Sequence, residues 1–293
     1  MYDHILFPTD GSDGADAVFA HVLDIATRHG ATVHILNVAD TTRDSVTRIG
    51  GEVVDALARE GERIVDEMAD RATARSVSTV TDVRQGGVSE TIAAYAEEYD
   101  IDLVTMSTQG RTGFTRLVLG SVTERVIRQS TVPVLALHPD EGSLRYPYRT
   151  VLLPTDGSAC AEAALNRAVT TASALDATLH LLSVVDTSGL SVHSDDQRDT
   201  LTAQASRTVE SAAETAGAAG VDSVVETTEE SDSVPEAVAA YTQTRDVDLV
   251  VMGTRGRSNL GQRILGSTTE QTVRTVPVPV LTVSESGSDD TSP

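Results

Sequence analysis

The octapeptide ILFPTDGS at residues 5–12 returns as VLLPTDGS at residues 151–158. Each copy opens with apolar residues and ends in Thr-Asp-Gly-Ser, the pattern of a buried strand that stops at a turn before a helix. Asp10 and Asp156 stand 146 positions apart, and this offset holds along the chain. It also pairs His34 with His180, Val38 with Val184, Tyr95 with Tyr241, Gly120 with Gly266 and Pro133 with Pro279. The chain is therefore a tandem repeat without net insertion or deletion.

The repeat predicts two domains, as expected for 293 residues. Copy one is expected at residues 1–138, a polar linker at 139–146 and copy two at 147–284. The last residues, 285–293, are polar and acidic and predict a disordered tail.

Within each copy, short β-branched runs alternate with longer alanine-rich amphipathic stretches, which is typical of a parallel sheet covered by helices. In copy one, strands are expected near residues 4–9, 32–38, 77–83, 102–107 and 133–137, and helices near 13–29, 45–74, 88–99 and 120–130. In copy two, strands are expected near residues 150–155, 178–184, 222–227, 248–253 and 279–283. The predicted fold class is α/β, with two tandem doubly wound, Rossmann-like domains. Each is a five-stranded parallel sheet of order 3-2-1-4-5 with helices on both faces.

Charge excludes some partners. The chain has 44 acidic and 22 basic residues and a formal net charge of −22, so a nucleic acid or an anionic membrane would be repelled. This acidity resembles that of halophilic, haloarchaeal proteins and is interpreted as a surface adapted to salt. The sequence shows neither a basic leader nor an apolar run of about 18 residues, which predicts a cytoplasmic protein.

Composition also excludes several chemistries. The chain has no lysine, which removes the phosphate-binding lysine of Walker A loops, Schiff-base cofactors and lysine general bases. The single cysteine, Cys160, cannot form an intramolecular disulfide, and a structural zinc cluster would need more cysteines. A buried, inert thiol is expected.

The strongest binding motif follows the fourth strand. In doubly wound sheets, ligands bind beyond the carboxyl ends of the strands where the strand order reverses, here between strands one and four. Gly253-x-x-Gly256 follows the fourth strand of copy two. After nine intervening residues, Gly266-Ser267 opens a helix. Glycines let a ligand approach the backbone, and a helix N-terminus offers N–H groups to phosphates. The sequence therefore predicts a phosphate cradle without lysine.

These motifs together, Pro-Thr-Asp-Gly-Ser and G-x-x-G-x9-G-[ST], resemble the ATP-binding class of universal stress proteins over both copies. The resemblance implies ATP or another adenine nucleotide as ligand, with Mg²⁺ or Mn²⁺ bound through the phosphates. The sequence itself shows no strong catalytic constellation, so no catalytic residue is expected. It implies that Asp10, Asp156, Val38 and Val184 hold adenine, while the glycine loop and Gly-Ser turn hold ribose and phosphates. Arginines next to the second glycine, Arg111 and Arg257, add a cation for the terminal phosphate.

The expected binding residues of copy two are Pro154, Thr155, Asp156, Val184, Gly253, Arg255, Gly256, Arg257, Gly266, Ser267, Thr268 and Thr269. Those of copy one are Pro8, Thr9, Asp10, Val38, Ser107, Gly110, Arg111, Gly120, Ser121, Val122 and Thr123. Copy two is expected to bind better, because a side chain at Ser107 would crowd the ribose where copy two has Gly253. Copy two departs elsewhere, with Asp232-Ser233 in place of Gly86-Gly87.

Some of these residues have a purely structural alternative. Asp10 and Asp156 could cap the following helix, which is compatible with adenine contact. Thr123 and Thr269 could bind phosphate or complete a local cap. The paired histidines, His34 and His180, lie among aliphatic residues of strand two and are interpreted as structural.

The expected function is that of a stress-response regulator or sensor that binds adenine nucleotide. One alternative is a slow ATPase or autophosphorylating enzyme with Ser121 or Ser267 as acceptor, although the sequence suggests no base at the phosphate end. Another is a nucleotide-independent dimerisation module that uses the fifth strands, 132–136 and 278–282. The resemblance implies an internal pseudo-dimer of the copies, and a homodimer is possible. The protein partner is not identified.

Overall fold

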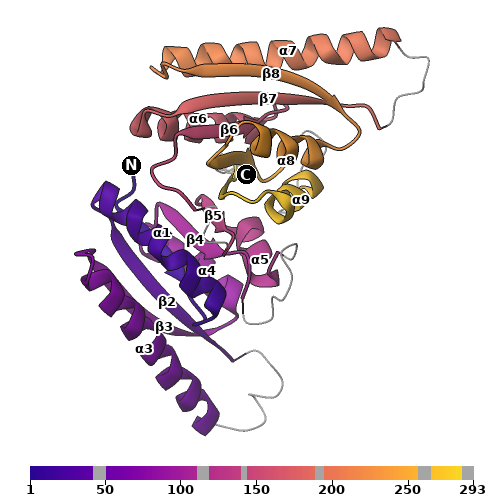
Figure 1. Ribbon diagram of the computed structural model, residues 1–293. Helices are drawn as coiled ribbons and strands as arrows, with labels where there is room; N and C mark the ends of the chain where they lie inside the picture. Colours follow the sequence, from indigo (N-terminus) through magenta and orange to yellow (C-terminus); the bar gives the residue numbers. More distant parts are fainter. Residues whose placement is uncertain (42–50, 111–118, 140–143, 189–194, 257–264, 286–293) are drawn as a thin grey trace, which may run out of the picture. The chain divides into compact units, whose positions relative to one another are not determined.

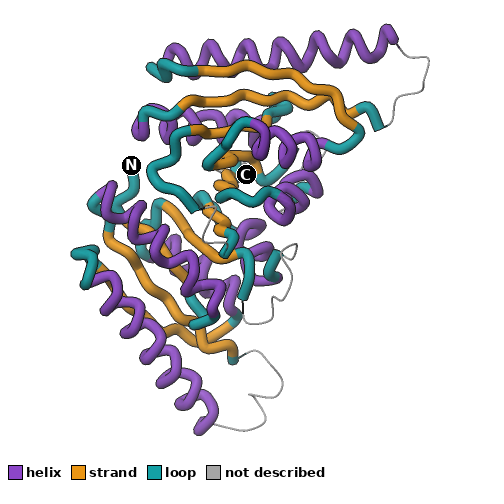
Figure 2. The backbone as a smooth tube through the Cα atoms, viewed as in Figure 1, coloured by secondary structure: helices purple, strands orange, loops and turns teal. Residues whose placement is uncertain are grey.

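The computed structural model describes residues 1–41, 51–110, 119–139, 144–188, 195–256 and 265–285. The chain divides into two compact units, Met1–Tyr146 and Pro147–Pro293 (Figure 1). In both units strands and helices alternate along the chain, as the tube in Figure 2 shows.

The first unit contains β1 (His4–Pro8), α1 (Asp13–His29), β2 (Thr32–Asp40), α3 (Gly51–Thr73), β3 (Thr79–Gly86), α4 (Val88–Glu98), β4 (Leu103–Ser107), α5 (Ser121–Gln129) and β5 (Val134–Leu137). The second contains β6 (Thr150–Pro154), α6 (Ala159–Leu175), β7 (Thr178–Asp186), α7 (Asp195–Ala218), β8 (Val224–Ser231), α8 (Val234–Thr244), β9 (Leu249–Gly253), α9 (Ser267–Thr275) and β10 (Val280–Val283).

Each unit is built on a parallel five-stranded sheet. The strand order is β3-β2-β1-β4-β5 in the first unit and β8-β7-β6-β9-β10 in the second. Every neighbouring pair within a unit is parallel. The predicted doubly wound order is therefore confirmed, and the strand order reverses between β1 and β4 and between β6 and β9.

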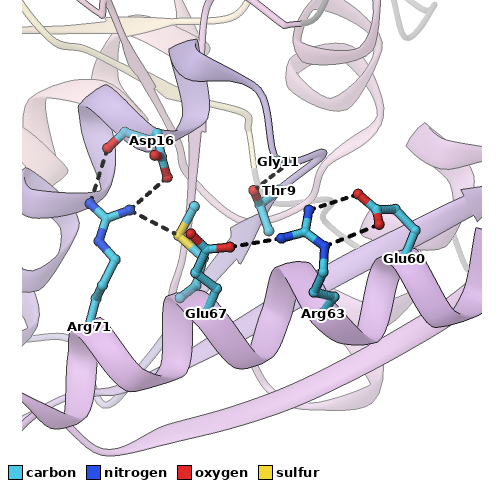
Figure 3. A network of polar contacts seen from close by, with 8 residues as sticks. Thr9, Gly11, Asp16, Glu60, Arg63, Glu67 and Arg71 are labelled. Carbon is cyan, nitrogen blue, oxygen red and sulfur yellow. Dashed lines mark hydrogen bonds and ion pairs between the residues drawn. The ribbon is translucent and has the colours of Figure 1, made fainter.

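Helices cover both faces of each sheet. Because crossovers between parallel strands are right-handed, α1 and α3 cover one face of the first sheet, while α4 and α5 cover the other. Arg71 of α3 donates to Asp16 of α1 over 2.6 Å, which joins the first pair (Figure 3). Ile5, Leu6 and Phe7 of β1 are fully buried, as expected for a strand covered on both sides. Among the described helices, none is both long and apolar enough to span a bilayer.

The Thr-Asp-Gly-Ser segment forms the turn that the sequence predicts. Gly11 and Gly157 have φ angles of 70° and 71°, a left-handed conformation that favours glycine. Ser12 then caps α1 by accepting a hydrogen bond from the N–H of Ala15 at 3.3 Å, and Ser158 caps α6 in the same way. The strand therefore stops and the helix begins within four residues.

The second and third strands are longer than predicted. In the first unit, β2 and β3 stay paired to Asp40 and Gly86, and β7 and β8 pair to Asp186 and Ser231. The ends of β3 and β8 are polar and only partly buried, so they lack the apolar pattern that marks a strand in sequence. The helix predicted at 45–74 begins at Gly51 in the described chain, and residues 42–50 lie outside it.

One buried histidine of the first unit is expected to respond to acid. His21 of α1 is 3% exposed and lies edge-on to Tyr146, with the ring centroids 5.9 Å apart. Burial lowers the pKa of His21 to about 4, against a smaller opposing effect of Asp24. The folded chain therefore holds this imidazole neutral at a pH where the unfolded chain protonates it.

We expect His21→Phe to reduce the loss of stability on acidification. The pKa of His21 is lower in the folded chain, so its contribution is complete above pH ~6.5 and is lost as the pH falls towards ~4, by about 3 kcal/mol. Denaturant unfolding of both proteins in high salt at several pH values measures the difference. Equal pH dependence of the two proteins would contradict the assignment.

Candidate functional site at the strand switch points

The aspartate after each first strand shapes the turn. The N–H of Thr9 donates to the carbonyl of Leu36 at 2.8 Å, the last backbone hydrogen bond between the β1 and β2 segments. One carboxylate oxygen of Asp10 then accepts the N–H of Ser12 at 3.0 Å. In the second unit, Asp156 accepts the N–H of Ser158 over the same distance. These aspartates therefore stabilise the turn through one oxygen.

The other carboxylate oxygen faces the loop after the fourth strand. An added Cβ on Gly110 would lie 3.2 Å from Oδ2 of Asp10. On Gly256 it would lie 2.9 Å from Oδ2 of Asp156. A side chain at either glycine would meet the carboxylate, so the close approach depends on the missing Cβ. The structure thus brings the aspartate and the second glycine of the motif together in both units.

The Gly-Ser motif opens α5 and α9 without a side-chain cap. Gly120 and Gly266 are the N-cap residues, and a glycine offers no side-chain acceptor to the first turn. Their own N–H groups bind the carbonyls of Thr108 and Thr254 at 2.8 and 2.9 Å, which fixes each helix start to the strand-four loop. The positive ends of two helices therefore lie beside the switch points, a favourable position for an anion.

The threonines one turn into these helices anchor them. Thr123 donates its hydroxyl to the carbonyl of Ser107 at 2.8 Å, and Thr269 donates to the carbonyl of Gly253 at the same distance. Both threonines are buried, whereas Ser121 and Ser267 are exposed. Of the two interpretations left open by the sequence, these bonds favour the local structural one for Thr123 and Thr269.

The second strand extends past the first and turns a backbone donor and acceptor towards the site. Backbone groups of alternate residues point to the same side of a parallel strand. The carbonyl of Leu36 faces β1, so the N–H and carbonyl of Val38 face the same way, where β1 has already ended. Val184 stands in the same relation to Leu182, whose carbonyl binds Thr155. Both valines are half-buried.

The remaining predicted residues lie around these contacts. Pro8 and Pro154 end the first strands of the two units, and both are half-buried. Arg255 is half-buried between the two glycines of the second loop. The arginines expected to meet the terminal phosphate, Arg111 and Arg257, lie outside the described residues.

The Ser107–Gly253 difference has a packing explanation. The hydroxyl of Ser107 accepts the N–H of Gln109 and lies 3.1 Å from where a Cβ on Gly14 would stand. In the second unit, Cys160 occupies the position of Gly14, and a Cβ on Gly253 would lie 2.8 Å from its carbonyl oxygen. Each unit thus has one glycine where the first helix meets the fourth strand. The hydroxyl of Ser107 lies towards α1. The weaker binding expected of copy one stays a prediction.

His138 was missed by the sequence analysis. It follows β5, is buried, and its Nδ1 lies 3.1 Å from the hydroxyl of Thr108, whose carbonyl holds Gly120. The sequence feature that indicates His138 is its position directly after the last strand of copy one. Because copy two has Ser284 there, comparison of the repeats did not draw attention to it.

Two doubly wound α/β units, each with an aspartate, a glycine loop and an uncapped helix at its switch point, define a tandem Rossmann-like protein. The model of the universal stress protein family matches residues 1–138 and 147–284, and the chain belongs to that family.

Known relatives match one copy or both. Universal stress protein MJ0531 of Methanocaldococcus jannaschii is 32% identical over 140 residues, which cover 47% of this chain and 82% of that protein. Universal stress protein MJ0577 of the same organism is 29% identical over 156 residues, with coverages of 47% and 95%. The crystal structure of a universal stress protein from Archaeoglobus fulgidus covers 98% of both chains, with a TM-score of 0.75 and 25% identity. The tandem arrangement therefore has a structural relative along its whole length.

We expect Gly253→Ser to destabilise the second unit by about 1–3 kcal/mol, because the new side chain would meet both the carbonyl group and the Cβ of Cys160. Adding Cys160→Gly removes the Cβ contact but leaves the backbone contact, recreates the Gly14–Ser107 pair of the first unit, and should recover part of the loss. Denaturant unfolding of both variants measures this coupling. Additive effects of the two substitutions would contradict the packing explanation.

Proposed function

We propose that the chain binds ATP or a related adenine nucleotide at the switch point of each copy and acts as a regulatory sensor in the stress response. The observation that carries this proposal is the backbone of Val38 and Val184 beyond the end of the first strand. One N–H and one carbonyl match the Watson–Crick edge of adenine, which offers the N1 acceptor beside the N6 amino donor. The Oδ2 atoms of Asp10 and Asp156 add an acceptor close by.

The phosphates would extend from this edge towards the uncapped helices α5 and α9. In copy two, the first-turn N–H groups of Ser267 and Thr268 would meet them, with the helix dipole in support. Ser121 and Val122 are the equivalent residues of copy one. The glycines Gly110 and Gly256 allow the ligand to approach the loop backbone.

A divalent cation, Mg²⁺ or Mn²⁺, is proposed to enter with the nucleotide. Such ions favour oxygen ligands and commonly bind through substrate phosphates. When bound, the ion would lower the negative charge of the nucleotide, which otherwise meets a chain with a formal net charge of −22. We therefore propose a nucleotide–metal complex as the ligand.

Binding would connect β2, the strand-one turn and α5, or their counterparts in copy two. A ligand that binds only the folded chain stabilises it in proportion to the logarithm of its free concentration. We propose that the nucleotide-bound units differ from the empty ones in stability and in affinity for a protein partner. This linkage is the proposed basis of sensing.

We expect the protein purified in high salt with Mg²⁺ to bind two adenine nucleotides per chain. Calorimetric titration with ATP measures the stoichiometry, and mass spectrometry of an extract identifies any nucleotide that co-purifies. One nucleotide per chain would restrict the proposal to one copy. Absence of binding would contradict it and favour the nucleotide-independent module.

Gly120→Asp and Gly266→Asp should each remove one site, because a carboxylate at the helix start repels phosphate. The double variant should bind no ATP. Gly217→Asp is the matched control: it adds the same charge where a new Cβ meets nothing within 4 Å. Unchanged ATP binding by the double variant would refute the proposed location.

A further inference from the structure

Asn37 of β2 makes an unusual bond at the end of the first strand. Its side chain is 7% exposed and donates from Nδ2 to the carbonyl of Thr9 at 2.8 Å. The β1–β2 register, in which Pro8 stands beside Leu36, puts Asn37 next to Thr9. A buried side-chain amide therefore binds the last carbonyl before Asp10.

If the β1–β2 ladder continued, the Thr9 carbonyl would accept a hydrogen bond from the N–H of Val38. In a parallel ladder, a residue that donates to one position of its neighbour accepts from the residue two positions further on. Thr9 donates to Leu36, so the next donor in line is the N–H of Val38. Pairing ends at Leu36 in the first unit and at the equivalent Leu182 in the second, so Asn37 does not itself end the ladder. It occupies the Thr9 carbonyl, and the N–H of Val38 remains directed at the proposed adenine position.

The first unit contains space made for this amide. An added Cβ on Gly61 of α3 would lie 2.5 Å from Oδ1 of Asn37 and 3.2 Å from its Cγ. In copy two the equivalent positions hold Ser183 and Arg207. The large and small residues are therefore exchanged between copies, and Ser183 has no amide to reach the Thr155 carbonyl.

We propose that Asn37 is a positioning residue that makes copy one more selective for adenine than copy two. Asn37 acts through Val38. Its amide donates to the Thr9 carbonyl, so this carbonyl does not compete for the Val38 N–H, which stays available to the base. In copy two no side-chain amide of the described residues occupies the Thr155 carbonyl, although β6 and β7 also end their pairing at Leu182. The proposed difference is that this carbonyl stays available to the N–H of Val184 when no ligand is bound. This inference rests on the proposed function.

The test measures each copy alone. Gly266→Asp leaves copy one as the binding site, and Gly120→Asp leaves copy two. Calorimetry gives the affinities for ATP and ITP with Mg²⁺. The hypoxanthine of ITP has an N1–H donor and an O6 acceptor, the reverse of adenine, so the ATP-to-ITP affinity ratio reports recognition of the base edge. We expect a higher ratio for copy one than for copy two.

In the protein with copy one alone, we expect Asn37→Ser to lower ATP affinity about fivefold and ITP affinity much less, since about one hydrogen bond is at stake. The affinity ratio then falls. If Asn37 had a purely structural role, the substitution would weaken the binding of ATP and ITP equally, because both nucleotides have the same ribose and phosphates. An unchanged ratio, with or without a change in unfolding midpoint, overturns the inference.

The reciprocal substitutions are made in the Gly120→Asp protein, in which only copy two is expected to bind nucleotide. Ser183→Asn together with Arg207→Gly supplies the amide and its space, and should raise both ATP affinity and the ATP-to-ITP ratio about fivefold. Arg207→Gly by itself is the control and should leave the ratio unchanged. This gain keeps the inference testable if Asn37→Ser does not fold.

Failure of the proposed function gives a different result. If the parent protein with copy one alone binds neither ATP nor ITP, the proposed function fails for copy one and the role of Asn37 falls with it. If that parent binds ATP and both exchanges leave the ratio unchanged, the proposed function stands and only the inference is overturned.

Discussion

The hydrogen bond from the N–H of Thr9 to the carbonyl of Leu36 marks the point on which the rest of each site depends. Beyond it the chain turns through Asp10 and the left-handed Gly11, so β1 stops while β2 continues. Because β1 stops early, the N–H and carbonyl of Val38 have no strand residue opposite them. The same turn lets α1 begin directly after it. The same bond in the second unit, from Thr155 to Leu182, has the same consequences.

Close packing explains how the copies differ without losing the fold. At the contact of the first helix with the fourth strand, one unit has Gly14 with Ser107, and the other exchanges the small and large residues. The contact of Asn37 with Gly61 follows the same pattern, because copy two has the smaller Ser183 and the larger Arg207 at these positions. Because protein interiors have little spare volume, a larger residue on one element requires a smaller one on its neighbour. A difference between the repeats at one position is therefore interpreted correctly only when the residue that contacts it is compared as well.

The units also join their helices differently. In the first, Arg71 of α3 and Arg75, just after this helix, form ion pairs with Asp16 and Asp24 of α1. These pairs are partly exposed, and such pairs contribute little to stability in high salt. In the second unit, α7 presents buried alanines such as Ala212. Because α3 and α7 both bury apolar side chains, apolar burial contributes more on this face than the exposed ion pairs do.

The sequence by itself determined the repeat, the α/β class, the strand order and the meeting of the strand-one aspartate with the second glycine after strand four, because these follow from local periodicity, turn chemistry and the rules of parallel sheets. The tertiary structure alone decided that β3 and β8 extend to their polar ends, that Ser107 faces α1, and that Asn37 binds the Thr9 carbonyl. These features depend on which residues of distant segments share a register and on where their side chains point. Such contacts between neighbouring elements leave no periodic signal in a single sequence.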